Sequence, residues 1–378
     1  MNVSVTTKRT SVRTLHGLLF VAWFAMPLAH TLAENSFVSF GDAGRLEYRR
    51  DERGNRLPDF SHCGYRGANR DVPNVVPRIV VSPYAPDDSK QIKAAIDYVA
   101  QLTANENGWR AAVLLILGEY NVSGQLRIQT SGVVLRGHGA GENGTTLRAT
   151  GLDRRSLIRV FPGKHEEMVH VHDRTFKIID DYVPVGANSV RLNSTEGLSV
   201  GAQVQVTHPS SSAWIETLEI DRLGWREGTR DIRWLRTITA ISENRIELDV
   251  PLTLAIDKTN CQATVQLVDD SNRLNEVGIE DLALVSEFNQ KNPKDEDHAW
   301  YGVHLQGVRD AWVRRVQFRH FAGGAVMLGD EASRITVSDC ASFDPVSEIG
   351  GYRRHTYFTL GQQCLFLRCW TENGLHDF

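Results

Sequence analysis

A loop close to the end of the chain holds the densest group of residues that could perform chemistry. It contains two adjacent glycines, a tyrosine, two adjacent arginines and a histidine, in the order Asp344-Pro-Val-Ser-Glu-Ile-Gly-Gly-Tyr-Arg-Arg-His355. Guanidinium groups bind carboxylates through paired hydrogen bonds, and loops that leave a rigid scaffold often carry binding residues. We therefore expect this loop to present positive charge to an acidic polymer.

The residue types in the loop suit one reaction, the removal of a proton next to a carboxylate. Abstracting the proton α to a uronate carboxylate requires a base and a group that neutralises the developing enolate charge. Arg353 or Arg354 would hold the carboxylate, and His355 or an arginine would take the proton. A calcium ion bound by Asp344 and Glu348 could neutralise the same charge. The opposing interpretation is a structural salt bridge between Asp344 and Arg354, because ion pairs imitate active sites in sequence.

Four copies of one short strand pattern surround this loop. They span residues 277–284, 311–318, 335–343 and 364–370, and in each an apolar marker residue follows a polar one. The markers are separated by 34, 24 and 29 residues and are Leu282, Val316, Cys340 and Cys369. Alternation with period two, in repeats of unequal length, predicts a parallel β-helix with the loop between its third and fourth coils. The polar residues before the markers are expected to form turns: Asp281, Arg315, Asp339 and Arg368.

An amphipathic helix is predicted ahead of the coils, between Ser82 and Leu102. Its apolar residues fall on one face, and Asp88 and Gln91 have the spacing of a capping box. Strands follow at residues 112–117, 118–122, 126–128 and 133–137. A helix in this position is typical of a cap over the first coil. The irregular segment from Glu34 to Pro77 is expected to pack along the outside of the solenoid.

The region of the helix and first strands resembles the opening of pectate lyase superfamily proteins. The resemblance rests on Asp87-Asp-Ser through Ala94-Ala-Ile-Asp97, on Gly118-x-Tyr120 and on Ser131-Gly-Val-Val-Leu-Arg-Gly-x-Gly139; it covers Val76 to Thr150 and returns after Val277. It implies a right-handed parallel β-helix that acts on a polysaccharide. Proteins of this superfamily usually continue for several more coils, whereas eight residues, Thr371 to Phe378, follow the fourth strand here. The chain is therefore expected to be short at its C-terminus.

A different pattern interrupts the coils between residues 180 and 254. Its segments alternate like exposed antiparallel strands, which predicts a small inserted β subdomain. Trp214, Trp225 and Arg226 in this stretch could line a sugar site, because indole faces stack on sugar rings. The alternative is that its tryptophans, including Trp234, form the core of the subdomain.

Three further aromatic or imidazole side chains are candidates for substrate contact. Tyr301 and His304 precede the second repeat and could lie one coil away from the loop, and Tyr352 belongs to the loop itself. His298, close to the first two, is interpreted as a solvated side chain.

The first 33 residues are typical of a secretory signal. Lys8, Arg9 and Arg13 precede an apolar run from Gly17 to Ala29, and Thr31-Leu-Ala33 suits signal cleavage. This run is shorter than the ~20 residues that cross a bilayer. Export to the periplasm or the cell exterior is therefore predicted, with no stable membrane span after cleavage, and an uncleaved anchor is the alternative.

Composition restricts the class of partner. The chain of 378 residues has a formal net charge of −4, and without the three basic residues of the leader 39 basic side chains face 46 acidic ones. This balance argues against a nucleic-acid partner. The five cysteines show no zinc spacing. Cys340 and Cys369 are expected to be buried thiols, with a disulfide as the alternative.

Together these observations predict an exported, all-β monomer built around a right-handed parallel β-helix. The expected parts are a signal peptide (1–33), an irregular segment (34–77), a helix cap with the first coils (78–179), an inserted subdomain (180–254) and further coils (255–378). The expected activity is that of a polysaccharide lyase on an acidic polysaccharide, with calcium as the one cofactor considered. The alternatives are a glycoside hydrolase that uses Asp339 or Asp344 with Glu348, and a non-catalytic glycan-binding or structural solenoid.

Overall fold

The structure is a computed structural model that describes residues 37–41, 46–84, 86–163 and 169–378. The chain divides into two compact units between Leu57 and Pro58. The described part of the first unit contains an antiparallel pair, β1 (Val38–Phe40) and β2 (Leu46–Tyr48). The predicted signal peptide lies outside the described residues. No helix in the described part of the chain is long and apolar enough to cross a membrane.

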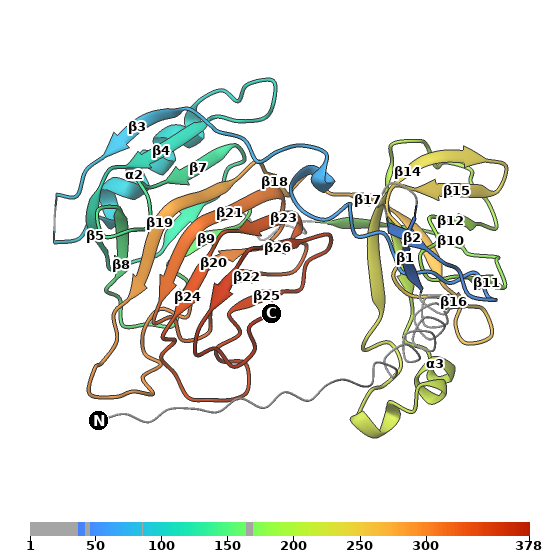
Figure 1. Cartoon of the computed structure of the whole chain (residues 1–378). Coiled ribbons are helices and arrows are strands. Elements are labelled where there is room, and N and C mark those ends of the chain that lie inside the picture. Colours follow the sequence, from blue (N-terminus) through green and yellow to red (C-terminus); the bar gives the residue numbers. More distant parts are fainter. Residues whose placement is uncertain (1–36, 42–45, 85, 164–168) are drawn as a thin grey trace, which may run out of the picture. The chain divides into compact units, whose positions relative to one another are not determined.

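The second unit contains a parallel β-helix whose coils each pass three sides, as Figure 1 shows. The first side consists of β3 (Pro77–Val81), β4 (Ala111–Leu115), β7 (Val133–Arg136), the first halves of β19 (Gly278–Ser286) and β21 (Val308–Arg319), β23 (Ser333–Ser338) and β26 (Leu365–Leu367). The second side consists of β5 (Gly118–Val122), β8 (Thr145–Ala149), the second halves of β19 and β21, β24 (Ala341–Phe343) and β27 (Trp370–Thr371). The third side consists of β6 (Leu126–Ile128), β9 (Ile158–Val160), β20 (Tyr301–Leu305), β22 (Gly324–Leu328) and β25 (Tyr357–Thr359). A short strand, β18 (Leu274–Asn275), pairs with the start of β21. The predicted β-helix is confirmed.

The strand register follows the repeat read from the sequence. Leu282 pairs with Val316, and the ladders on either side of Val316 place it opposite Cys340. The polar residue before each marker has left-handed backbone, with φ of 60° at Asp281 and 53° at Arg315. Asp339 and Arg368 continue this column at 54° and 51°. These residues turn the chain from the first side to the second, which confirms that they belong to turns.

A second column of left-handed residues lies five positions earlier in each coil. It consists of Glu276, Asp310, Arg334 and Gln363, with φ between 52° and 59°. Residues other than glycine and asparagine seldom adopt this conformation, so each corner must be held by its neighbours. Charge pairs between successive coils do this: Arg315 lies 2.5 Å from Asp281, and Arg334 lies 2.5 Å from Asp310.

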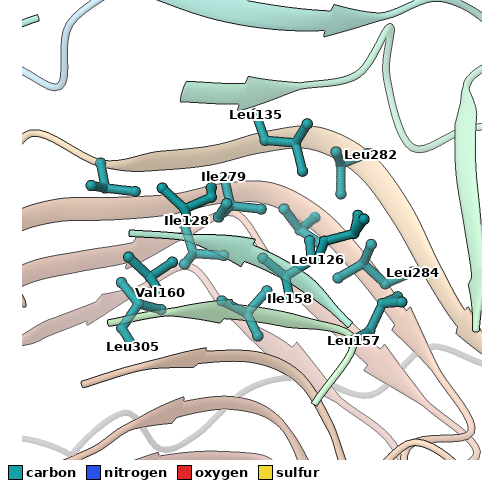
Figure 2. Close-up of a cluster of buried hydrophobic side chains, with 14 of the residues drawn as sticks. Leu126, Ile128, Leu135, Leu157, Ile158, Val160, Ile279, Leu282, Leu284 and Leu305 are labelled. Atoms are coloured by element: carbon teal, nitrogen blue, oxygen red, sulfur yellow. The ribbon is translucent and has the colours of Figure 1, made fainter. Parts of the chain in front are cut away.

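Stacked aliphatic side chains fill the interior of the coils. Figure 2 shows ten labelled members of this core, each at most 1% exposed: Leu126, Ile128, Leu135, Leu157, Ile158, Val160, Ile279, Leu282, Leu284 and Leu305. Full burial of such a side chain stabilises the fold by roughly 1.5–3 kcal/mol. Cys340 belongs to the same core and Cys369 packs against it, and all five cysteines are free thiols. Burial raises the pKa of the Cys340 thiol.

The predicted helix is present as α2 (Ser89–Gln101) and covers the first coil. Its apolar face is buried in the solenoid core and consists of Ile92, Ala95, Ile96 and Val99. The capping residues differ from the prediction. The Asp88 carboxylate accepts a hydrogen bond from the amide of Asn121 (3.1 Å), and Gln91 binds the Asp88 side chain instead of its backbone. Asp88 therefore ties the cap to the second side.

The segment from Pro58 to Pro77 packs along the outside of the first side, which agrees with the prediction for this part of the irregular segment. It contains a short 3-10 helix, η2 (Tyr65–Ala68). The Tyr65 ring meets Trp312 edge to face at 5.3 Å, and its amide donates to Thr336. Arg314 donates to the carbonyl oxygens of Val72 and Pro73. We call this segment the strap.

Two fully buried glutamates lie beneath the strap. Glu280 accepts from Arg136 (2.5 Å), from Arg314 (2.6 Å) and from the Trp312 indole (2.9 Å). Glu276 accepts from the Tyr65 hydroxyl (2.5 Å) and the Trp109 indole (2.7 Å).

Arg66 adds a positive charge beside Glu276, because its guanidinium lies 2.5 Å from the carboxylate. Burial and the neighbouring Glu276 raise the pKa of Tyr65 to about 12. Each glutamate is thus matched by cations and hydrogen-bond donors, as buried charges require.

The inserted subdomain is an antiparallel sheet with its own core. The strand order is β10-β17-β13-β14-β15-β12. These strands are β10 (His170–Lys177), β12 (Ser189–Arg191), β13 (Gln203–His208), β14 (Ile232–Ser242), β15 (Arg245–Leu248) and β17 (Thr264–Asp269). A small pair, β11 (Tyr182–Val183) with β16 (Ile256–Asp257), accompanies the sheet. The sheet extends beyond the predicted limits of 180 and 254, since it includes β10 and β17. The sequence did not reveal β10 because this edge strand is mostly polar and carries no alternating pattern.

We predict that Glu280→Gln lowers the free energy of unfolding by about 3–5 kcal/mol, because it leaves two largely buried guanidinium groups without a negative partner. Urea unfolding followed by tryptophan fluorescence measures the change. Asp281→Asn is the matched control. It removes an exposed ion pair, keeps a side chain that accepts left-handed backbone, and should cost less than about 1 kcal/mol. Equal losses in the two variants would contradict the role given to burial.

Candidate functional site

Two loops that lead into the third side are held together by a buried histidine. The first loop comprises residues 287–300 and precedes β20, and the second comprises residues 344–356 and precedes β25. His298 belongs to the first loop, is fully buried and contacts the second. Its Nε2 donates to the carbonyl oxygen of Val346 (3.0 Å), and its Nδ1 accepts from the Ser286 hydroxyl (2.9 Å). Burial lowers the pKa of His298, so the ring is neutral. The interpretation of His298 as a solvated side chain is therefore wrong.

A largely buried carboxylate gathers the charged groups of these loops. Glu296 is 9% exposed and binds the Arg353 guanidinium, with 3.1 Å between Oε2 and Nη2. Arg154 lies 3.2 Å from the same carboxylate, and the amide of Glu348 donates to it at 3.3 Å. The Arg353 hydrogen bond lowers the pKa of Glu296 and raises that of Arg353. At neutral pH Glu296 is therefore ionised and Arg353 is charged.

An aromatic pair borders the same group. The Trp300 indole is 7% exposed, and the Tyr352 ring, 59% exposed, lies 5.6 Å from it. Arg154 lies 5.4 Å above the Trp300 ring and Arg353 lies 5.1 Å above the Tyr352 ring. Gly323 leaves the space that the indole occupies, since a Cβ there would overlap it. We call Arg154, Glu296, Trp300, Tyr352 and Arg353 the loop cluster.

The neighbouring arginine and histidine have different surroundings. Arg354 has left-handed backbone and donates through Nη2 to the carbonyl oxygen of Ser347 (2.8 Å), so its side chain braces the loop. His355 lies 3.1 Å from the carbonyl oxygen of Gly351 through Nε2, and its ring meets His376 edge to face at 4.8 Å. Because a carbonyl oxygen only accepts, Nε2 carries the proton and Nδ1 of the neutral ring has a free electron pair.

The two carboxylates considered for calcium each face a basic side chain. Asp344 lies 3.1 Å from Arg319, and Glu348 lies 3.0 Å from Lys294. The predicted salt bridge between Asp344 and Arg354 is therefore replaced by other partners. Within the described ranges, no group of three or more His, Cys, Asp or Glu side chains could hold a metal ion. The two residues do not form a ready cation site, because calcium would have to displace a lysine and an arginine.

The outer face of the third side carries a row of side chains from successive coils. In register, these residues are Arg127, Arg159, His304, Met327 and Phe358. No strand of this side contains an acidic residue. Arg159 donates to Gln306 (3.1 Å), and no carboxylate in the described part of the chain pairs with it or with Arg127.

His304 lies in this row, and the ring of Tyr301, which pairs with Gly324 at the start of β20, lies 5.9 Å from the His304 ring, measured between centres. Burial and the charge of Arg159 lower the pKa of His304 to about 4.

The structure thus brings some of the predicted site residues together and separates others. Arg353 and Tyr352 belong to the loop cluster, and Tyr301 and His304 belong to the third side. Trp214, Trp225 and Arg226 belong to the inserted subdomain.

Sequence reasoning missed Arg154, Glu296 and Trp300 in the loop cluster, and Arg127 and Arg159 on the third side. Single outward arginines in Leu-Arg-Ile and Ile-Arg-Val could have signalled the last two.

Comparison with known proteins yields only distant structural likenesses. No protein-family model matches the sequence, and no curated protein matches it. The tailspike of Pseudomonas phage phi297 aligns with a TM-score of 0.38 and 11% identity over 75% of this chain and 44% of that chain. The tailspike of E. coli bacteriophage HK620, in complex with a pentasaccharide, aligns with a TM-score of 0.34 and 12% identity over 91% of this chain and 41% of that chain.

A third likeness is to the tailspike of Acinetobacter baumannii bacteriophage AP22, in complex with a capsular saccharide. It has a TM-score of 0.28 and 9% identity, over 68% of this chain and 49% of that chain. The chain spans less than half the length of each of these tailspikes. The fold described above rests on the strand pairing of this chain alone.

We predict that Arg159→Gln raises the pKa of His304 above about 4, because a positive charge beside the imidazole is removed. The pKa should stay below 6.5, since burial is the larger cause of its lowering. Titration of the His304 imidazole proton by NMR measures the change. Arg127→Gln, one strand further away, should produce a smaller rise. An unchanged pKa in Arg159→Gln would contradict the electrostatic coupling.

We predict that acid loosens the contact between the two loops. The pKa of Glu296 lies below 4.5 in the folded protein, so its pair with Arg353 contributes fully above that pH. The contribution is lost as the pH falls through the lowered pKa. The Glu348 amide, which donates to Glu296, should then gain intrinsic-rate-corrected hydrogen exchange as the pH is lowered stepwise from about 6 through the lowered pKa. In Glu296→Gln the corrected exchange of this amide should not depend on pH over the same range, and a pH dependence equal to that of wild type would contradict the assignment.

Proposed function

We propose that this chain binds an acidic polysaccharide at the loop cluster and the third side, and cleaves it at a uronate by β-elimination. The observation that carries the proposal is the loop cluster itself. An exposed tyrosine rests on a buried indole, with Arg353 and Arg154 above the two rings. Aromatic rings pack on sugars, and guanidinium groups bind carboxylates.

The charges on the third side favour an acidic ligand. Arg127 and Arg159 lie directly opposite each other on adjacent strands, and such strands are about 4.8 Å apart. Like charges directly opposite each other on neighbouring strands are unfavourable, and within the described residues no carboxylate compensates these two. The Arg127 guanidinium donates to Gln125 and the Arg159 guanidinium donates to Gln306. An anionic group between the two guanidinium groups would relieve the repulsion. The row continues to His304, so a polymer lying across the strands would contact several coils.

Each group of the loop has a distinct role in the proposed elimination. Arg353 is kept protonated by Glu296, so it serves as the clamp for the uronate carboxylate rather than as the base. His355 is the proposed base, because its Nδ1 has a free electron pair while Nε2 is held by Gly351. The proton α to the carboxylate passes to this nitrogen, and the developing enolate charge faces Arg353. Collapse of the enolate forms a carbon–carbon double bond and breaks the bond from the β carbon to the glycosidic oxygen. The leaving oxygen takes a proton from water, and His355 returns its proton to the solvent. Arg354 positions the loop through Ser347.

Hydrolysis fits these residues less well. A glycosidase needs a protonated carboxylic acid that donates to the leaving oxygen. Arg353 lowers the pKa of Glu296, and Arg368 lowers that of Asp339, so both carboxylates are ionised at neutral pH. Asp344 and Glu348 each face a basic side chain.

The reaction is tested by incubating the purified protein with uronate polysaccharides such as polygalacturonate and alginate. A lyase produces unsaturated ends that absorb ultraviolet light, whereas a hydrolase produces reducing ends without this absorbance. Binding without either product would leave a glycan-binding solenoid and overturn the enzymatic part of the proposal.

We predict that Arg353→Ala lowers kcat/KM by at least about 100-fold and that His355→Ala lowers it by about 10²–10⁴-fold. Arg353→Lys keeps a positive charge beside Glu296 but cannot form the paired hydrogen bonds that a guanidinium group makes with a carboxylate, so it should retain part of the activity. The matched control is Arg319→Ala, whose guanidinium pairs with Asp344 outside the loop cluster and which should stay within about twofold of wild type. Normal turnover per folded molecule in Arg353→Ala would sink the assignment, with the folded fraction measured by thermal unfolding.

A further inference from the structure

A long excursion leaves the sheet of the inserted subdomain between β13 and β14. The two strands pair antiparallel from Gln203 to His208, yet residues 209–231 connect them, whereas two to five residues suffice for a hairpin. This connection carries α3 (Ser212–Thr217) and η3 (Asp221–Leu223). Figure 1 shows α3 beyond the ends of these strands. Connections longer than about 12–15 residues are uncommon in compact domains, and this one contains a helix and a 3-10 turn of its own.

The base of the excursion is fixed by hydrogen bonds. The Asp231 carboxylate accepts from the amide (2.9 Å) and the hydroxyl (3.0 Å) of Ser210. The Ser210 hydroxyl in turn accepts from the amide of Arg230 (3.0 Å). Ser211 caps α3 by accepting from the amide of Trp214 (3.2 Å). Trp214, near the start of the excursion, and Arg230, near its end, are therefore both fixed through their backbone amides by Ser211 and Ser210.

Two of the three tryptophans in this region stand outside the subdomain core. Trp234 is 4% exposed, belongs to the core and donates to the Thr253 hydroxyl (3.0 Å). Trp214 and Trp225 are half-buried, with ring centres 6.1 Å apart and planes at 53°. The prediction that tryptophans form the core thus holds for Trp234, whereas the other two form an aromatic pair of their own.

The pair rests on a buried histidine. His208, at the end of β13, is 1% exposed, and its ring meets Trp214 at 5.1 Å and 62°. Burial lowers the pKa of His208, and within the described residues its Nδ1 has no hydrogen-bond partner. A buried nitrogen without a hydrogen-bond partner carries an energetic penalty. The His208 imidazole therefore places an unpaired polar atom next to the Trp214 ring.

A cation completes the group. The Arg230 guanidinium lies 5.5 Å above the Trp225 ring, and no carboxylate of the described chain forms an ion pair with it. Arg226, which the sequence suggested, is exposed, and its main chain binds Thr229. Two adjacent indoles with an uncompensated guanidinium match a sugar ring that carries a carboxylate.

We propose that Trp214, Trp225 and Arg230 form a second binding site, for an acidic sugar residue of the same polysaccharide. This inference rests on the proposed function for the nature of the polymer, but it uses residues that the loop cluster does not contain. The two sites would act on one long chain, so occupation of the subdomain site raises the effective concentration of polymer at the loop cluster. Short oligosaccharides would gain nothing from it.

The test compares binding of long polygalacturonate and of a trimer by the full chain, using affinity electrophoresis and calorimetry. Trp225→Ala and Arg230→Gln should each weaken binding of the polymer at least about fivefold and leave trimer cleavage unchanged. Arg226→Gln and Leu223→Ala are matched controls, since both are exposed in the same excursion, and they should stay within about twofold. Near-ultraviolet circular dichroism verifies that each variant is folded.

The outcomes separate this inference from the proposed function. If Tyr352→Ala abolishes polymer binding while Trp225→Ala and Arg230→Gln bind as wild type does, the second site is overturned and the loop cluster stands. If the subdomain variants lose binding while Tyr352→Ala and Arg353→Ala cleave normally, the second site stands and the proposed function fails. Loss of binding in Arg226→Gln equal to that in Arg230→Gln would overturn the specific role of Arg230. No binding of any uronate polymer by wild type would overturn both.

Discussion

The burial of Glu280 and Glu276 on the first side imposes the strictest constraint on this molecule. A parallel β-helix can normally leave the outer face of each side to water, but two fully buried carboxylates require cations and a cover that excludes solvent. Arg136 and Arg314 come from the coils, whereas Arg66 and Tyr65 come from the strap. The strap therefore belongs to the folded state of the solenoid. Its hydrogen bonds reach four coils, through Glu276, Asp310, Thr336 and the backbone of Gln363.

This arrangement assigns different tasks to the sides of the β-helix. The first side is closed by the strap, and its charges are matched within the protein. The third side has arginines at Arg127 and Arg159 that no described carboxylate matches, and the loops beside it hold an exposed tyrosine. The proposed function extends the polymer over this side because these two cations have no described carboxylate partner, whereas Arg353 and Arg154 in the loop cluster share Glu296. Arginine is thus structural on the first side and, in the proposed function, binds the ligand on the third.

The sequence predicted the solenoid well, because stacking forces apolar residues to recur at one register. Leu282, Val316 and Cys340 could be aligned by eye, and their spacing reproduces the strand pairing. The sequence could not show which charged residues meet in space. Glu296 and Arg353 are 57 positions apart, and their contact depends on the lengths of two loops that carry no repeat. Likewise, the alternation places Trp234 in the core because this residue lies in β14, but it gives no information on Trp214, which lies in the connection between β13 and β14.

The two columns of left-handed corners determine where this fold can change. Because the two corners lie five positions apart in each coil from β19 onward, as from Glu276 to Asp281 or from Asp310 to Arg315, an added residue there would break the alignment with the coils above and below. The connections that enter and leave the third side bear no such restriction, and lengthening a loop twofold costs only about 0.6 kcal/mol of closure entropy. A whole antiparallel sheet is accommodated after β9. New recognition elements can thus be acquired on this flank without disturbing the stack, so homologous chains should diverge in specificity here while keeping identical corners.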